Sequence, residues 1–258
     1  MIGKPDSALV GTLHPSPNFE PRRGVGRPSM LLLHYTGVAS AAKAIDWLSR
    51  PESKVSAHYV VDEAGHVTQM VAEVMRAWHA GLAVWAGDSD INSASIGIEI
   101  HSPGHELGYP DFPEAQMRAV EALCQDIIAR HAIAPARVLA HSDVAPTRKK
   151  DPGEKFPWAR LAASGIGHWV APEPVNRADP GIARDASGPL VAEVQTMLAN
   201  YGYGLAATGG CDPRTEFVVT AFQRHFRPER VDGRIDQSTI TTLERLTAAL
   251  PGGAAVAP

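Results

Sequence analysis

The stretch MLLLHY, residues 30–35, decides how the first half of this chain folds. A short, continuous apolar run bounded by turn residues is typical of a strand that is buried in a sheet. The run carries His34 near its end, and the turn-forming Thr36 and Gly37 follow it. We therefore predict a buried strand that presents a histidine where it ends.

Extended and helical patterns alternate on the C-terminal side of this strand. In chain order they predict a helix, a hairpin, a strand, a helix and a last strand, at residues 40–50, 57–71, 95–101, 113–131 and 136–144. Strands that alternate with helices indicate an α/β domain. We predict a mixed central sheet flanked by helices, within a first domain of residues 1–170.

The predicted strand SIGIEIH, residues 95–101, sorts its side chains into two faces. Alternation places three isoleucines on one face and Gly97, Glu99 and His101 on the other. The isoleucine face suits a core. Glu99 therefore points away from that core, either into a site or, as the simpler alternative, into solvent.

The last third of the chain has a different character. Residues 171–187 contain three prolines and no periodicity, which is typical of a linker. Within residues 188–250, three helical patterns follow, and Asp212 and Asp236 are suitable N-caps. We predict a small C-terminal three-helix domain, followed by a disordered tail at residues 251–258.

Composition excludes several classes of protein. The 258 residues are 44% hydrophobic and 20% charged, with a formal charge of -4, so we expect a globular protein without nucleic-acid partners. Cys124 and Cys211 lie too far apart for a CxxC pair and offer no disulfide framework. The sequence contains neither a secretory signal nor a membrane-spanning stretch, so we expect a cytoplasmic monomer, with the periplasm as the alternative compartment.

Histidines and carboxylates at strand ends are the candidates for chemistry. Strands of one sheet can bring such ends together although they are distant in sequence. Two imidazoles and a carboxylate with one open position would make a catalytic zinc site. Spacing alone does not select the ligands: the best trio is His34, His141 and Asp151, and the other candidates are His58, His79, His101 and Asp143. A single histidine at a strand end is more often only a hydrogen-bonded structural residue.

Six segments, taken in order, resemble one family. They are LLLHYT, SAHYVVDEAGHV, AWHAG, NSASIGIEI, FPEAQ and AHSDVAPTRKKDPG, within residues 15–160. This ordered set is similar to the zinc-dependent N-acetylmuramoyl-L-alanine amidases of the type 2 amidase family, which are related to peptidoglycan recognition proteins. The resemblance implies a mixed sheet with a substrate groove over one face. The C-terminal pattern resembles three-helix peptidoglycan-binding domains; the alternative is a helical cap that only packs on the first domain.

The resemblance also implies roles for individual residues. The Zn²⁺ ligands correspond to His34, His141 and Asp151. The catalytic glutamate corresponds to Glu99, which would exchange protons with water and the leaving amine, and Lys149 would stabilise the oxyanion. Without the resemblance, Lys149 would be an ordinary residue of a basic loop.

Two further histidines match positions near the substrate groove of the family. For His58 and His79 we expect contact with the substrate or support of the site, with plain packing as the alternative. One departure is Ala57, because some relatives have a catalytic tyrosine there; the form of the site that uses Glu99 is the better match.

The implied reaction is hydrolysis of the amide between N-acetylmuramic acid and L-alanine. Without a signal peptide, we expect soluble 1,6-anhydro-muropeptides from cell-wall recycling as the substrate. The alternatives are an exported amidase acting on the sacculus and a recognition protein that binds muropeptides without cleaving them.

Overall fold

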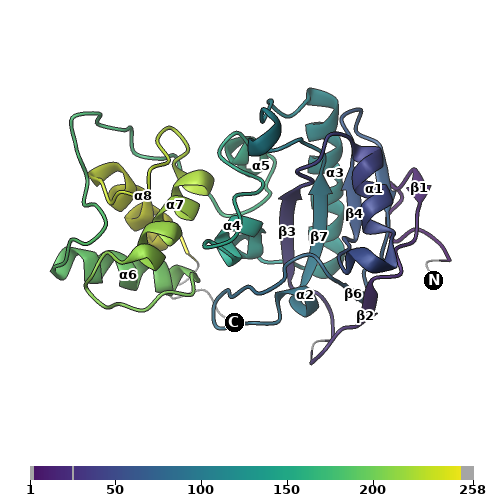
Figure 1. The fold of residues 1–258 in the computed structure, drawn as a ribbon, viewed down its shortest axis with the longest axis horizontal. Coiled ribbons are helices and arrows are strands. Elements are labelled where there is room, and N and C mark those ends of the chain that lie inside the picture. Colours follow the sequence, from purple (N-terminus) through teal and green to yellow (C-terminus); the bar gives the residue numbers. More distant parts are fainter. Residues whose placement is uncertain (1–2, 25, 251–258) are drawn as a thin grey trace.

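A six-stranded sheet organises the first half of the molecule (Figure 1). Its strands lie in the order β1 (Thr12–Leu13), β5 (Val67–Gln69), β4 (Tyr59–Val61), β7 (Ser95–Ile100), β3 (Met30–Tyr35) and β8 (Val138–Ala140). Strands β4, β7, β3 and β8 run parallel to one another, whereas β5 is antiparallel to β4. The computed structural model describes residues 3–24 and 26–250 and confirms the mixed sheet. A second, two-stranded sheet pairs β2 (Phe19–Pro21) with β6 (Met75–Ala77).

Helices cover both faces of the main sheet. On one face, α3 (Glu114–His131) packs its apolar side against Leu31 and Leu33 of β3 and the isoleucines of β7. On the other face, α1 (Ala41–Leu48) packs with Val60 of β4. Three short helices complete this half: α2 (Ile91–Ala94), α4 (His141–Val144) and α5 (Trp158–Ala163). Single 3-10 turns occur at Pro51–Ser53, His105–Leu107 and Pro135–Arg137.

Most of the elements expected from the sequence are present. The hairpin of β4 and β5 and the helix after Pro113 are confirmed. The strand expected at 136–144 is wrong in extent, since β8 ends at Ala140 and the chain turns at once into α4. The cause is local: the Asp143 side chain accepts a hydrogen bond from the backbone N–H of Ala140, at 2.8 Å, which closes a helical turn.

Three helices form the C-terminal part of the described chain, α6 (Pro189–Tyr201), α7 (Pro213–Phe226) and α8 (Gln237–Ala248) (Figure 1). The expected caps are confirmed: Asp212 accepts from the backbone N–H of Thr215, and Asp236 from that of Thr239. We call the segment from α6 through α8, with its connecting loops, the C-terminal module. None of the helices in the described ranges has the length and apolarity that a membrane crossing requires.

The module shares one hydrophobic core with the first half of the chain. Trp85 is fully buried and makes edge-to-face contacts with Tyr201 and Tyr203 of the module, at centroid distances of 5.9 and 4.9 Å. Gly202, between them, lies so close to this indole that a Cβ would come within 2.5 Å of it. Glycine is therefore required where the backbone of the module meets Trp85.

The segment 171–187 contains no helix or strand, but hydrogen bonds attach it to the module. The backbone N–H of Glu173 donates to Thr242 of α8, and the Ser238 hydroxyl donates to the carbonyl of Glu173. Cys124 and Cys211 are both buried free thiols. The tail expected to be disordered, 251–258, lies outside the described residues.

Candidate active site

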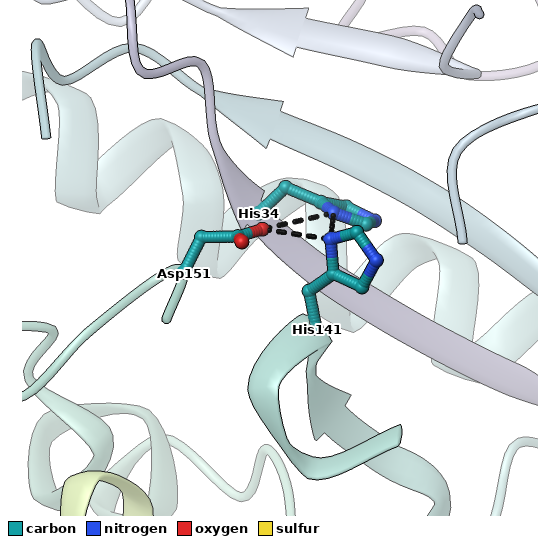
Figure 2. Close-up of side chains that lie close together, drawn as sticks. All are labelled: His34, His141 and Asp151. Carbon is teal, nitrogen blue, oxygen red and sulfur yellow. Dashed lines mark hydrogen bonds and ion pairs between the residues drawn. The ribbon is translucent and has the colours of Figure 1, made fainter. Parts of the chain in front are cut away.

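Three side chains converge at the carboxyl ends of the parallel strands (Figure 2). His34 lies near the end of β3, His141 begins α4 directly after β8, and Asp151 follows in the next loop. The Nδ1 atoms of the two histidines are 2.8 Å apart, and Asp151 Oδ2 lies 3.2 Å from His34 Nδ1 and 2.9 Å from His141 Nδ1. All three side chains are at least 90% buried. Within the described ranges, this is the group of histidines and carboxylates with the geometry to hold a metal ion.

The loop between the two ligand positions is closed on itself. The backbone N–H of Ser142 donates to the carbonyl of Asp151, at 3.0 Å, so that the two ends of the loop are joined. Behind Asp151, the Tyr109 hydroxyl donates to the carbonyl of Pro152, at 2.7 Å. Gly153 has a φ of 85°, and a Cβ there would come within 2.2 Å of that hydroxyl. The backbone of the sequence DPG is therefore held in one position, and this fixes where the Asp151 carboxylate lies.

In both His34 and His141, the hydrogen bond made by Nε2, the nitrogen that points away from the cluster, fixes the tautomer. His141 Nε2–H donates to the carbonyl of Ala80, at 3.0 Å, which leaves the Nδ1 lone pair free. The tautomer of His34 follows from a chain of bonds. Ser95 donates its hydroxyl proton to the carbonyl of Ile91, at 2.5 Å, so it can only accept from His79 Nε2–H, at 3.3 Å.

The tautomer of His79 in turn determines the tautomer of His34. With its proton on Nε2, His79 presents an Nδ1 lone pair, which accepts from His34 Nε2–H at 3.0 Å. His34 Nδ1 is then also an acceptor. With both rings neutral, no proton remains among the three converging atoms, so two nitrogen lone pairs and a carboxylate face one another. A cation satisfies such a donor set, and the N, N, O composition suits Zn²⁺.

The protonation states agree with this conclusion. Burial and the neighbouring His141 lower the pKa of His34 to about 4, so its ring is neutral at pH 7. Burial alone would raise the pKa of Asp151, but His141 and His34 outweigh it and hold that pKa well below the usual range. A neutral imidazole and an ionised carboxylate are the forms that bind metals.

A groove of about 440 Å³ opens over this cluster. Its lining includes the aromatic rings of Tyr35, Trp47 and Trp78, and also Glu99 and Lys149. Aromatic faces and charged groups in one cavity are typical of a site for a ligand with both apolar and polar parts.

Glu99 lies on β7 directly beside His34, its partner in the strand register. Its Oε2 atom is buried and has no hydrogen-bond partner within the described part of the chain. Burial and the Asp151 charge raise the pKa of the Glu99 carboxyl to about 8, against the opposing effect of Lys149. A carboxyl that titrates near neutral pH can both take up and release a proton.

Two of the other candidate ligands, His58 and His101, lie outside the cluster. His58 is fully buried, accepts from the backbone N–H of Gly97 and contacts the carbonyl of Met75, so its geometry agrees with the packing alternative. His101 contacts Thr36 and Glu63 outside the cluster.

The contacts of two residues, Asp143 and Ser95, could not be found from sequence motifs. Asp143 faces away from the cluster, where Tyr203 and His225 bind it. The sequence singles out Asp143 only as a candidate metal ligand, and no pattern marks Ser95, which supports His79, as part of the site. Only the folded chain brings these side chains together.

The comparisons with known proteins agree with this geometry. The family model described as N-acetylmuramoyl-L-alanine amidase matches residues 24–154, and the model of a peptidoglycan binding domain matches residues 187–243. N-acetylmuramoyl-L-alanine amidase AmiD of Escherichia coli is 37% identical over 237 residues, which cover 85% of this chain and 82% of AmiD. The 1,6-anhydro-N-acetylmuramyl-L-alanine amidase AmpD of Citrobacter freundii is 31% identical over 58% of this chain and 87% of its own length.

Solved structures extend the likeness to the whole fold. The complex of Escherichia coli AmiD with the substrate anhydro-N-acetylmuramic acid-L-Ala-D-gamma-Glu-L-Lys has a TM-score of 0.75 and 32% identity, covering 90% of this chain and 98% of that one. AMPDH3 of Pseudomonas aeruginosa in complex with anhydromuramic pentapeptide has a TM-score of 0.73 and 28% identity, covering 98% and 100%. With a family match over half of its length and a metal-ready cluster in the matched region, the chain belongs to the N-acetylmuramoyl-L-alanine amidases, a family of hydrolases.

Proposed function

We propose that this protein is a zinc amidase that cleaves the bond between N-acetylmuramic acid and the L-alanine of a stem peptide, with 1,6-anhydro-muropeptides as its substrates. One observation carries the proposal: the Glu99 carboxyl, which has no hydrogen-bond partner among the described residues, faces the same groove as the cluster of His34, His141 and Asp151. A general base and a metal site beside one cavity are what metal-assisted amide hydrolysis needs.

In this proposal His34, His141 and Asp151 hold the ion. Zn²⁺, when bound there, supplies a Lewis acid for the scissile carbonyl and lowers the pKa of water. Glu99 removes a proton from the attacking water and delivers it to the amine of L-alanine as the C–N bond breaks. Lys149 donates to the carbonyl oxygen as negative charge develops on it.

His79 acts in this scheme through His34. Its Nδ1 atom accepts the Nε2–H of His34 and so keeps the Nδ1 lone pair of His34 toward the ion. Its ring borders the groove, but both nitrogens already have partners. We assign His58 a structural role, because none of its surface is accessible to a substrate.

The anhydro-sugar is supported by the relatives and by the groove. The AmiD and AMPDH3 complexes contain anhydromuramic peptides. In this chain, aromatic rings line the cavity for an apolar sugar face, and Arg148, Lys149 and Lys150 supply positive charge for stem-peptide carboxylates. These features fit recycling of soluble fragments.

The match of residues 187–243 to a peptidoglycan binding domain supports a second candidate, an exported amidase that acts on the sacculus. In both cases we propose a catalytic domain within 1–170, a connecting segment at 171–187 and the module at 188–250. We also propose a monomer, in the cytoplasm for the recycling role and in the periplasm for the alternative.

Parallel assays with two substrates distinguish the recycling role from the exported enzyme. Equal amounts of purified protein would be incubated with intact sacculi and with anhydro-muropeptides, and the released peptides measured by mass spectrometry. The recycling role predicts rapid cleavage of the soluble muropeptides and slow release from sacculi. Rapid release from sacculi alone would refute it and support the exported enzyme. Binding without any release from either substrate would support a recognition protein.

A further inference from the structure

Asp143 is a fully buried carboxylate in the loop that carries the metal-binding side chains. It accepts three hydrogen bonds: from the backbone N–H of Ala140 at 2.8 Å, from the Tyr203 hydroxyl at 2.7 Å and from His225 Nδ1–H at 2.7 Å. Two of these three donors belong to the C-terminal part of the chain, 60 and 82 positions away. A buried carboxylate depends on such donors, since water cannot replace them.

Aromatic packing holds both donors, Tyr203 and His225, in place. The Tyr203 ring packs edge-to-face on Trp85, and only 2% of the residue is exposed. The His225 ring is stacked between Trp158 and Phe226, at centroid distances of 3.7 and 3.8 Å. Neither donor can move without disturbing the shared core, so together they fix Asp143 in space.

The position of Asp143 determines where His141 lies. Both residues belong to the four-residue helix α4, which lies between the sheet and the module (Figure 1). The bond from Ala140 N–H to Asp143 closes the turn on which His141 stands. In the same turn, Ser142 N–H holds the carbonyl of Asp151. A shift of α4 would therefore move two of the three proposed ligands.

We infer that the C-terminal module is a structural part of the metal centre, with Tyr203 and His225 as positioning residues that hold His141 and Asp151 through Asp143. This role is independent of any glycan affinity of the module. It gives the module a function within the catalytic unit, in addition to or in place of anchoring to the wall. The inference rests on the zinc site of the proposed function.

The test compares two single-atom changes in the full-length protein. Tyr203→Phe removes the hydroxyl bound to Asp143 and keeps the ring on Trp85. Tyr201→Phe is the matched control: this tyrosine is equally buried, belongs to the same module and packs on the same indole, but its hydroxyl bonds His168. Zinc affinity would be measured by competition with a chromophoric chelator, and the visible spectrum of the Co²⁺-substituted proteins would report the coordination geometry.

We expect Tyr203→Phe to weaken zinc binding by about tenfold or more, the usual effect of losing a group that supports a ligand. The Co²⁺ spectrum should change, and at saturating zinc kcat should fall while KM stays constant. Tyr201→Phe should bind zinc as the wild type does. If both variants match the wild type in affinity and spectrum, the inference is wrong.

A second pair of variants covers the case that Tyr203→Phe folds poorly. His225→Phe keeps a stacked ring without the donor, whereas His225→Asn keeps an N–H near the position of Nδ1 without the ring. The inference predicts weaker zinc binding for His225→Phe and partial rescue by His225→Asn, and the reverse order would refute it. A wild-type protein that binds no zinc would instead refute the proposed function itself, so the two failures are distinguishable.

Discussion

Glu99 combines three properties that rarely occur together in one carboxyl. It borders a groove, one of its oxygens is buried with no partner in residues 3–24 and 26–250, and its pKa is raised to about 8. A purely structural carboxylate would have acquired a donor, because an unsatisfied buried oxygen costs about 1–3 kcal/mol. That cost is understandable if the free oxygen has to bind a water molecule and exchange its proton.

The variant Glu99→Gln tests this reading directly. It keeps the size of the side chain but cannot accept a proton, so hydrolysis should fall by roughly 10²–10⁴-fold. Zinc content and muropeptide binding, measured by elemental analysis and calorimetry, should be retained. The exposed Glu52→Gln serves as the control and should leave turnover unchanged. Hydrolysis at the wild-type rate in Glu99→Gln would exclude Glu99 as the base.

Gly97 offers a second test at the residue scale, because the His79 ring lies directly over it. A Cβ at Gly97 would come within 2.5 Å of His79 Nδ1, the atom that accepts from His34. Gly97→Ala should therefore displace His79 and weaken zinc binding by about 10–100-fold. Gly210→Ala is the control, since a Cβ there meets nothing within 4 Å. Unchanged zinc affinity in Gly97→Ala would contradict the supporting role of His79.

At the scale of elements, short sequence patterns correctly predicted those helices, strands and caps that depend on interactions between residues close in sequence. Apolar periodicity placed β3, β7 and α3, and the Asp212 and Asp236 caps were read from their side-chain chemistry. The extent of β8 was wrong because the turn at Ala140 depends on a carboxylate three residues later, which overrides a β-prone sequence. The trio of His34, His141 and Asp151 came mainly from family resemblance, since spacing alone left four other candidates open.

Glu73, in the segment after β5, accepts hydrogen bonds from α3. These bonds make the free energy of unfolding depend on pH. Burial by itself would raise the pKa of the Glu73 carboxyl, but hydrogen bonds from Arg130, His131 and Tyr59 hold it at about 2. The usual value is 4.5, so the folded state favours the ionised form. This stabilisation is complete above pH 4.5 and is lost as the pH falls from there toward 2.

Urea unfolding of wild type and Glu73→Gln at several pH values measures this contribution. At pH 7 the variant should be less stable by about 3 kcal/mol, the equivalent of the pKa shift. The difference should shrink steadily between pH 4.5 and 3. Asp46→Asn, which breaks an exposed pair with Arg50, should cost under about 1 kcal/mol. A difference for Glu73→Gln that does not vary with pH would contradict the assignment.

At the scale of the whole molecule, the two halves share a core, which the sequence offered only as the alternative of a helical cap packed on the first domain. A proline-rich segment suggested a tethered domain, whereas Trp85, Leu139 and Val144 of the first half belong to the same cluster as Val194 and Phe222 of the module. Contacts over such sequence distances have no periodic signature. They depend on how complete elements dock, which a single sequence does not reveal.

A shared core predicts cooperative unfolding. Calorimetry of the metal-free protein should give a single transition, because neither half retains its buried surface without the other. Addition of zinc at 100 times its dissociation constant should stabilise the whole chain by about 2.7 kcal/mol and raise that one transition. Two resolved transitions, with only the first responding to zinc, would show that the halves unfold independently.

In the proposed function, His34, His141 and Asp151 form a zinc site that drives amide hydrolysis. The most direct test measures bound zinc and cleavage of an anhydro-muropeptide on the same samples of wild type and His141→Ala, before and after chelation. We expect about one zinc ion per wild-type chain, activity lost on chelation and restored by zinc, and neither zinc nor activity in the variant. Full hydrolysis by the metal-free wild type, or by His141→Ala, would contradict it.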